Sequence, residues 1–476
     1  MKILLIEPNI NLYALMPTMS LTYLKGFIKE KTKHDAKIID LVFHKKDWKR
    51  HLIEELRKEK PDLIGLSVLS FNYLEGLKIA RFIKNNFDIK TIFGGVHVIL
   101  SPENVIQNNE VDIVCTGEGE GVLEELLDND LNCTGVRGIW YKAGGQIIKN
   151  KNRRLIENLD NLAFPDFNDF DLEKYFAINH NHLPITASRG CPYACSYCSN
   201  HALKKKVEGK YVRFRSVDNI IQEIELRIKQ YHKEGFKYLY FFDDTFILDR
   251  DFVLEFCKKF KRRGFNKLIK WNVNVRADLV TDEIIKSMKD AGCYEARMGV
   301  EAGSDYIRNK VYNKNITKEQ IFNAFGTIKK YGLQLRLYFI VGAPYETMGM
   351  MEESLEMAKQ SLADDAFFTP LYPLPGTEKK KTCEKENIIE KSNERKHHNA
   401  IINPVARTNF VSSTQLQKFN QKIKRRQTGK YFQEGIKSNT IFFIWDVLLF
   451  LLYFKRKYDL EQNQLFRWSV QKYRLK

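Results

Sequence analysis

Three cysteines stand close together in the middle of the chain, at Cys191, Cys195 and Cys198. Spacings of four and three residues allow a single loop to turn all three thiols toward one point. Three thiolates supply three corners of an iron–sulfur cubane and leave one iron without a protein ligand, which is a place to bind and reduce another molecule. The spacing therefore predicts an iron–sulfur cluster on these three residues.

A zinc ion is the alternative occupant of this loop, but a structural zinc site needs four closed ligands. The chain offers a fourth ligand from His201, Cys257, Cys293 or Cys383, if the fold brings one of them near. The context favours the cluster. The cysteines follow a short apolar run over residues 183–187, which predicts a loop after a strand, and the aromatic Tyr197 directly precedes the last cysteine.

Composition indicates a globular protein of more than one domain. The 476 residues are 43% hydrophobic, which suffices for the cores of two or three domains. Residues 1–7 lack the features of a signal peptide. Eight cysteines with three in one motif argue against a secreted disulfide scaffold, so we expect a cytoplasmic protein.

The net charge of +18 raises the alternatives of a nucleic-acid partner or an anionic membrane surface. Much of the excess lies in short runs, such as residues 204–206 and 424–426, and no RNA-recognition motif accompanies them. We therefore expect solvated basic surfaces and no nucleic-acid partner.

Residues 1–150 alternate short apolar runs with helical patterns, which predicts an α/β domain with a doubly wound, Rossmann-like parallel sheet. Ligands of such sheets bind at the carboxyl ends of the strands. Glycines follow two of the predicted strands there, at Gly94, Gly95 and Gly117. Ordinary turn formation is the alternative role for each of them.

Residues 136–182 have the character of a connector. A hairpin is predicted around Gly144 and Gly145, and residues 151–182 form a linker rich in Asn, Asp and Pro.

Residues 183–378 again alternate six strand-like runs with helices, and polar residues or glycine end the strands. Barrel-type α/β enzymes place their chemistry at such ends. One acidic residue alone is usually a helix cap or a surface ion pair, but several strand ends in register with the cysteine loop favour a common site. The residues concerned are Asp243, Asp244, Arg276, Glu301, Ser304 and Gly342.

Residues 379–476 differ in composition and predict a mainly helical C-terminal region. Residues 441–454 are strongly apolar and are followed by the basic residues 455–457. This stretch is too short for a secure transmembrane helix of about 20 residues. It predicts either an interfacial helix near lipid or a helix packed on the barrel.

The cysteine motif with its aromatic residue resembles that of the radical S-adenosylmethionine (SAM) enzymes. The resemblance implies a partial barrel of six strands, with a [4Fe–4S] cluster on Cys191, Cys195 and Cys198. In that family the open iron binds SAM, and one electron from the cluster cleaves SAM to a 5′-deoxyadenosyl radical. The resemblance implies these SAM contacts: Tyr197 and Gly342 near the adenine, Asp243 and Asp244 in the loop for the amino group, and Arg276, Glu301 and Ser304 at the ribose and carboxylate.

Residues 1–150 resemble the cobalamin-binding domain that precedes many radical SAM domains. The resemblance rests on Pro17, the turn of residues 94–97, Pro102-Glu103 and residues 117–120. It implies cobalamin contacts from Gly94, Gly95, His97, Gly117 and Glu118. His97 either contacts the periphery of the corrin or is a structural residue.

The chain departs from cobalamin proteins that ligate cobalt from below. Those proteins carry an Asp-x-His-x-x-Gly loop, whereas Asp40 and His44 have the wrong spacing and no following glycine. We therefore expect no histidine of this stretch on cobalt.

The resemblance implies methylation of an unactivated carbon, in which a carbon radical receives the methyl group of methylcobalamin. One alternative is the cyclase type of oxidation, as in the anaerobic magnesium-protoporphyrin monomethyl ester cyclase. Another is an RNA methylthiotransferase, but those enzymes hold a second cluster on three N-terminal cysteines, and only Cys115 and Cys133 precede the motif here. The expected partners are a small-molecule substrate, hydrophobic if residues 441–457 contact a membrane, and a low-potential donor of the flavodoxin or ferredoxin type.

Overall fold

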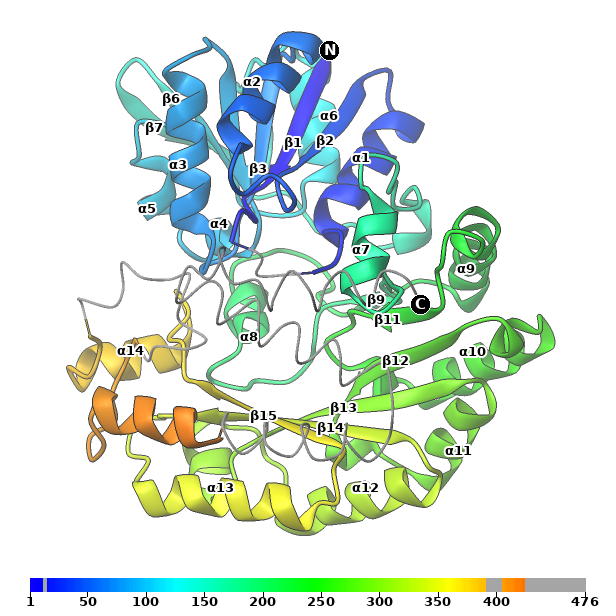
Figure 1. Ribbon diagram of the computed structural model, residues 1–476. Coiled ribbons are helices and arrows are strands. Elements are labelled where there is room, and N and C mark those ends of the chain that lie inside the picture. Colours follow the sequence, from blue (N-terminus) through cyan, green and yellow to red (C-terminus); the bar gives the residue numbers. More distant parts are fainter. Residues whose placement is uncertain (12–14, 391–404, 424–476) are drawn as a thin grey trace, which may run out of the picture. The chain divides into compact units, whose positions relative to one another are not determined.

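Two sheets carry the fold, one of seven strands and one of six, as the computed structural model of the protein shows (Figure 1). The structure describes residues 1–11, 15–390 and 405–423. Both sheets belong to one compact unit, Met1–Leu416. The α/β class and the two-sheet organisation predicted from the sequence are confirmed.

The N-terminal sheet has the strand order β2-β1-β3-β4-β5-β6-β7. Its first five strands are parallel: β1 Lys2–Glu7, β2 Asp35–Asp40, β3 Leu63–Ser67, β4 Lys90–Gly94 and β5 Ile113–Cys115. The predicted hairpin around Gly144 and Gly145 is confirmed as β6 Ile139–Ala143 and β7 Gln146–Lys149. It is not part of a connector, because β6 pairs antiparallel with β5 and extends the sheet.

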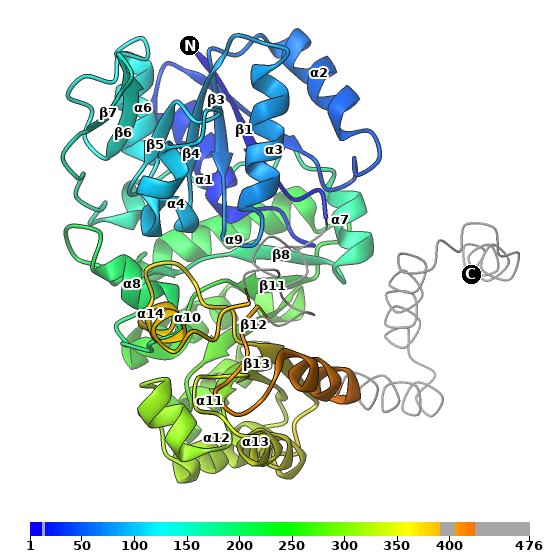
Figure 2. The ribbon, with the colours of Figure 1, turned by 90° about the vertical axis from the view of Figure 1, so that its left-hand side faces the viewer.

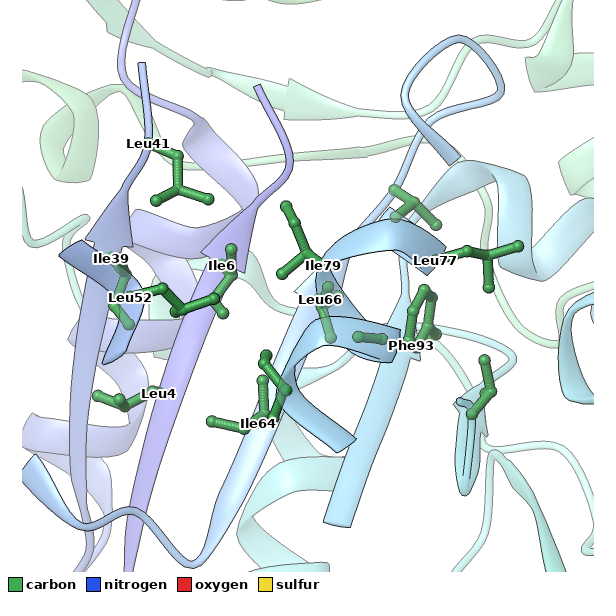
Figure 3. Packing of buried hydrophobic residues seen from close by; sticks show 14 of the residues in the cluster. Leu4, Ile6, Ile39, Leu41, Leu52, Ile64, Leu66, Leu77, Ile79 and Phe93 are labelled. Carbon is green, nitrogen blue, oxygen red and sulfur yellow. The ribbon is translucent and has the colours of Figure 1, made fainter. Parts of the chain in front are cut away.

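Six helices connect these strands. They are α1 Met19–Lys31, α2 Trp48–Glu59, α3 Tyr73–Lys84, α4 Val96–Leu100, α5 Pro102–Ile106 and α6 Glu120–Asp128. Helices α2 and α3 bury Leu52, Leu77 and Ile79 against Leu4, Ile6, Ile64 and Phe93 of the strands (Figure 3). A parallel strand that is covered on both faces needs a continuous apolar run. These runs allowed the strands to be predicted from the sequence.

The second sheet is wholly parallel, with the order β15-β14-β13-β12-β11-β8. Its six strands confirm the predicted partial barrel: β8 His182–Ile185, β11 Tyr238–Phe241, β12 Lys270–Val275, β13 Cys293–Glu301, β14 Gln334–Val341 and β15 Asp365–Pro370. Its long helices lie along the outer face of the sheet (Figures 1 and 2). They are α9 Val217–Tyr231, α10 Arg250–Arg262, α11 Asp282–Asp290, α12 Lys318–Lys330 and α13 Met348–Gln360.

Shorter elements surround the cysteine loop. The loop lies between β9 Ser188–Arg189 and α8 Ser199–Lys204, and β9 pairs antiparallel with β10 Arg213–Phe214. The remaining elements are α7 Leu172–Ile178, α14 Glu378–Lys385, the 3-10 turns η1 Leu159–Asn161, η2 Phe246–Leu248, η3 Phe265–Lys267 and η4 Ala277–Leu279, and the π-helical turn η5 Tyr306–Val311.

The C-terminal region is described only in part. Helix α14 ends at Lys385, and residues 413–423 are helical. The predicted interfacial segment, residues 441–457, lies outside the described residues. Within the described ranges, no helix has the length and apolar character needed to cross a membrane.

Candidate site at the cysteine loop and the glycine-lined cavity

A cavity of about 280 Å³ lies at the carboxyl ends of the parallel strands of the N-terminal sheet. Strands β1, β3, β4 and β5 form its floor, and helices α1 and α6 form its sides. Its lining is mostly apolar side chains and glycine backbone. Thr186 and Arg189, which belong to the start of the barrel, complete the wall.

Four of the residues predicted to contact cobalamin line this cavity: Gly94, Gly95, Gly117 and Glu118. Gly95 has φ +97°, and a Cβ added there would lie 2.6 Å from the carbonyl oxygen of Val68. A side chain at this position therefore meets both backbone strain and a collision. Gly117 differs, because a Cβ added there has no neighbour within 4 Å and would occupy open space in the cavity.

Neither of the histidines considered from the sequence lines the cavity. His97 is buried, its Nδ1 lies 3.0 Å from the Ser70 hydroxyl, and its ring stacks on Tyr73 at 4.2 Å between centroids. These contacts fit a structural role, which is one of the two roles expected for it. His44 stacks on His51 at 3.7 Å and lies 3.4 Å from Asp47.

Two acidic residues that follow β5, Glu118 and Glu120, reach Arg189 of β9, just before the cysteine loop. Glu118 Oε1 accepts from Arg189 Nη1 at 2.7 Å, and Glu120 Oε1 accepts from Arg189 Nη2 at 2.7 Å. Glu118 Oε2 also accepts from Arg213 Nη1 at 2.9 Å and from the Ile156 amide at 2.8 Å. Burial opposes ionisation of Glu118, but the two guanidiniums outweigh it and lower the pKa of its carboxyl.

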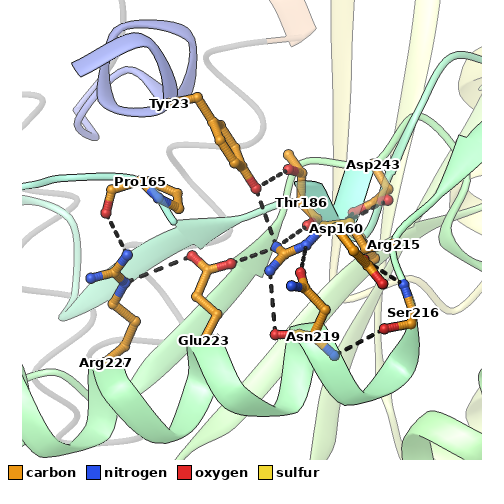
Figure 4. Close-up of polar contacts among 11 residues, drawn as sticks. Tyr23, Asp160, Pro165, Thr186, Arg215, Ser216, Asn219, Glu223, Arg227 and Asp243 are labelled. Atoms are coloured by element: carbon orange, nitrogen blue, oxygen red, sulfur yellow. Dashed lines mark hydrogen bonds and ion pairs between the residues drawn. The ribbon is translucent and has the colours of Figure 1, made fainter. Parts of the chain in front are cut away.

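A second polar contact joins helix α1 to the start of the barrel (Figure 4). The Tyr23 hydroxyl lies 3.1 Å from the Thr186 hydroxyl and accepts from Arg215 Nη1 at 3.2 Å. Arg215 is held in turn by the buried Glu223 at 2.5 Å. Side chains that line the cavity are thus tied to the strand end that leads into the cysteine loop.

The cysteine loop is anchored along its length. Gly190, which opens it, has φ +89°, and a Cβ there would lie 2.4 Å from the Tyr211 carbonyl. The Ser196 amide donates to the Tyr312 carbonyl at 2.9 Å, and the Cys198 amide donates to the Cys195 carbonyl at 3.1 Å. All three cysteines of the motif are free thiols.

Three thiols on one loop match the donor set of a cubane cluster, which takes three thiolates and leaves one iron open. Among the described residues, no group of three or more His, Cys, Asp or Glu side chains lies close enough to hold one metal ion. Donors also point at two sulfurs, from Arg276 Nη1 to Cys195 at 3.9 Å and from Asn200 Nδ2 to Cys198 at 3.8 Å. Burial raises the pKa of the Cys198 thiol to about 11.

The four residues considered as a fourth zinc ligand have other surroundings. His201 Nε2 lies 3.0 Å from Glu378 Oε1, and the remaining three are buried in different elements. Those three are Cys257 in α10, Cys293 in β13 and Cys383 in α14.

The paired aspartates after β11 have different environments. Asp243 is buried and accepts from the Ala187 amide at 3.0 Å and from the Ser188 hydroxyl at 2.5 Å, and burial raises the pKa of its carboxyl to about 6. Its oxygens therefore hold the backbone that leads into the cysteine loop. Asp244 is exposed and bonds to the side chain of Asn200. Of the two, Asp244 is the one whose carboxylate is open to a ligand.

Arg276, at the end of β12, holds the cysteine loop in place. Its guanidinium lies 3.7 Å from the ring centre of Tyr193, in the middle of that loop. It also pairs with Asp278 at 2.8 Å and donates to the Lys314 carbonyl. The guanidinium of Arg276 is therefore engaged in contacts with the cysteine loop and its neighbours.

Glu301, at the end of β13, forms a buried ion pair. It has φ +70°, an uncommon conformation for a residue other than glycine. Its Oε1 accepts from Lys314 Nζ at 2.7 Å, and both side chains are less than a tenth exposed. Lys314 Nζ also lies 3.5 Å from the Tyr197 hydroxyl. Burial raises the pKa of Tyr197 well above its usual value, so this phenol stays protonated.

The two remaining predicted residues lie beside this group. Ser304 is buried, and its carbonyl accepts from the Arg308 amide at the start of η5. Gly342 has φ +87°, and its amide donates to Glu346 Oε2 at 2.6 Å. Burial raises the pKa of Glu346 to about 7.

Sequence reasoning missed Arg189, Glu120 and Lys314 as site residues. Arg189 and Glu120 stand inside motifs that were recognised, next to Gly190 and Gly119. Lys314 follows β13 by several residues and carries no pattern of its own. Its role depends on the left-handed turn at Glu301, which the sequence does not signal.

Comparison with known proteins matches both domains of the chain to known families. Residues 185–358 match the model of the radical SAM superfamily, and residues 9–127 match that of the B12 binding domain. An uncharacterized methyltransferase of Pyrococcus horikoshii is 30% identical over 411 residues, which are 85% of this chain and 86% of that protein. The anaerobic magnesium-protoporphyrin IX monomethyl ester cyclase of Rubrivivax gelatinosus is 30% identical over 398 residues, 78% of this chain and 68% of that protein.

Solved structures show the same arrangement of domains. The radical SAM methyltransferase TsrM from Kitasatospora setae superposes with a TM-score of 0.68 at 18% identity, covering 82% of this chain and 76% of that one. The fold and site therefore define a radical SAM enzyme. The chain belongs to the cobalamin-binding members of the radical SAM superfamily, whose cofactors are a [4Fe–4S] cluster, SAM and cobalamin.

Proposed function

We propose that the protein methylates an unactivated carbon of a small-molecule substrate. When bound, the cluster with SAM supplies a radical that removes a hydrogen atom, and methylcobalamin supplies the methyl group. A saturated carbon is not a nucleophile, so a polar transfer of the methyl group does not reach it. The protein's own contribution is to hold the two cofactor sites in fixed positions.

One observation carries this proposal. Arg189 lines the glycine-bounded cavity and stands two residues before Cys191. The cavity wall and the cysteine loop therefore share a side chain. Methyl transfer to a carbon radical requires a methyl donor beside the place where the radical forms, and this arrangement supports that requirement.

The roles of individual residues form part of the proposal. Cys191, Cys195 and Cys198 are the cluster ligands, and Arg276 holds the loop that carries them. Asp244 and Ser304 offer polar groups toward SAM, with Tyr197 and Gly342 near the adenine. Gly94, Gly95, Gly117 and Glu118 form the cobalamin surface, and no histidine from residues 40–44 ligates cobalt.

Product analysis tests the reaction. Protein with its cofactors reconstituted is given methyl-labelled SAM, a low-potential reductant and substrate-containing cell extract. Methylation predicts label in a product together with 5′-deoxyadenosine and S-adenosylhomocysteine, because one SAM is cleaved and a second remethylates the cobalamin. Electron supply through a flavodoxin or ferredoxin type of donor predicts that such a protein replaces the chemical reductant.

The similarity to a cyclase supports a second candidate, oxidation without methyl transfer. This reaction begins with the same hydrogen abstraction and predicts 5′-deoxyadenosine without S-adenosylhomocysteine or labelled product. That result would show that the protein carries out the cyclase-like oxidation and not methylation. A hydrophobic substrate and contact of residues 441–457 with lipid remain predictions, which flotation of full-length and 1–436 proteins with anionic vesicles tests.

A further inference from the structure

Both ends of the cysteine loop rest on the N-terminal domain. Arg189 precedes the first cysteine and forms ion pairs with Glu118 and Glu120, which follow β5. Helix α8 follows the last cysteine and packs against helix α4, which begins directly after Gly95. Segments that follow β4 and β5 therefore contact the two elements that flank the cysteine loop, α8 and Arg189 of β9.

The contact at Arg189 is specific in geometry and charge. Its two terminal nitrogens each donate at 2.7 Å, one to Glu118 and the other to Glu120. The Glu120 and Arg213 side chains are each 4% exposed, whereas those of Glu118 and Arg189 are 16% and 24% exposed. Two guanidiniums thus face two carboxylates in a partly buried cluster. A planar guanidinium that bridges two acids fixes direction as well as distance.

The same residues bound the cavity. Arg189, Glu118 and Glu120 all line it, and the Arg189 guanidinium lies 5.4 Å from the ring centre of Tyr23, another lining residue. A molecule that fills the cavity would contact these side chains. A cluster on the three cysteines would hold the backbone two residues beyond Arg189.

We propose that Arg189, with Glu118 and Glu120, is a positioning residue that couples corrinoid binding in the cavity to cluster assembly on the cysteine loop. The inference rests on the cofactor assignment within the proposed function but not on the fate of the methyl group. Cobalamin in the cavity orders Glu118 and Glu120, and a cluster on the cysteines orders Arg189. Each cofactor therefore prepares one side of the same ion pair. Coupling between two binding sites is reciprocal, so each cofactor raises the affinity for the other by the same factor.

The test measures binding rather than turnover. Hydroxocobalamin affinity is determined by absorbance for full-length protein with a reconstituted cluster and for the same protein without iron. A Cys191→Ala, Cys195→Ala, Cys198→Ala variant serves as a second cluster-free form. For the wild type we expect tighter binding with the cluster, by a factor within the range of about 5 to 150 that is typical of coupled sites.

Variants locate the coupling. In Arg189→Gln the ratio of the two affinities is expected to fall to about 1, whereas Arg189→Lys keeps the charge and retains part of the ratio. Lys37→Gln is the matched control, because Lys37 also bridges two carboxylates, Glu55 at 2.6 Å and Glu59 at 2.8 Å, at a distance from the cavity. This control is expected to keep the wild-type ratio.

Further controls separate a general loss of folding from a loss of coupling. Circular dichroism checks that each variant is folded. The variant Glu120→Gln removes the same contact from the other side while leaving the cysteine loop unaltered. The electron paramagnetic resonance spectrum of the reduced cluster is expected to shift on cobalamin addition in the wild type and not in Arg189→Gln.

A wild-type ratio of 1, or an unchanged ratio in folded Arg189→Gln, would overturn the inference. Failure of methyl transfer alone would leave it standing. Failure of the wild type to bind any corrinoid would remove the cofactor assignment as well.

Discussion

The two sheets differ in the residues that stand at the carboxyl ends of their strands. In the N-terminal sheet, glycines follow β4 and β5 and expose backbone to a cavity with mostly apolar walls. Strands of the barrel sheet end in charged side chains that are buried and held by hydrogen bonds or ion pairs, such as Asp243, Arg276 and Glu301. At its glycines the first edge leaves out side chains, whereas the second edge holds them, so the same substitution has different consequences at the two positions.

The largest effect is expected at the cysteine loop. Changing Cys191, Cys195 and Cys198 together to Ala should abolish both iron binding, about four irons per chain in the reconstituted wild type, and SAM cleavage. Iron analysis and 5′-deoxyadenosine formation measure the two losses. A triple variant that still cleaves SAM, or tightly bound zinc in place of iron, would contradict the assignment.

The buried pair at the end of β13 comes next. Glu301→Gln leaves the ammonium of Lys314 without its buried partner and should lower the free energy of unfolding by about 3–5 kcal/mol. Lys286→Gln breaks the exposed pair of Lys286 with Asp290 and should change it by less than about 1 kcal/mol. Denaturant unfolding measures both. Equal effects would show that the charged edge of the barrel is not maintained by burial.

The pH dependence of stability tests Glu346. Its folded pKa of about 7 exceeds the ordinary value of 4.5, so the folded protein binds more protons than the unfolded chain between these limits. The contribution of Glu346 is therefore fully present below pH 4.5 and is lost as the pH rises through 7, by about 3 kcal/mol in total. The variant Glu346→Gln should lack this part of the profile. Parallel profiles of the two proteins would exclude the predicted titration.

The glycine edge provides the smallest and most selective effects. Gly95→Ala meets backbone strain and the Val68 carbonyl and should lower stability by about 1–3 kcal/mol. Gly117→Ala fills open space and should leave stability within about 0.5 kcal/mol while weakening cobalamin binding. Thermal unfolding and absorbance titration separate the two. Loss of stability in Gly117→Ala would contradict the open cavity at that position.

Much of the architecture was predictable because it depends on local patterns. Continuous apolar runs predicted the buried parallel strands, Gly144 and Gly145 predicted the hairpin β6–β7, and the apolar run over residues 183–187 predicted that the cysteines lie on a loop after a strand. Gly95 was placed correctly at a strand end. The sequence did not predict that β6 pairs with β5, because strand pairing is decided between segments rather than within one.

The partners of the charged residues were decided by the tertiary structure. The sequence placed Asp243 at the end of β11, but only the fold brings Ala187 and Ser188 to its carboxylate. Arg189 lies 71 residues from Glu118, and no local pattern links them.

The type and spacing of residues determine which chemistry a chain has available, because they are fixed along the backbone. Which charges pair, and which remain open to a ligand, depends on burial and on distances between segments far apart in sequence. Those quantities exist only once the two sheets have packed.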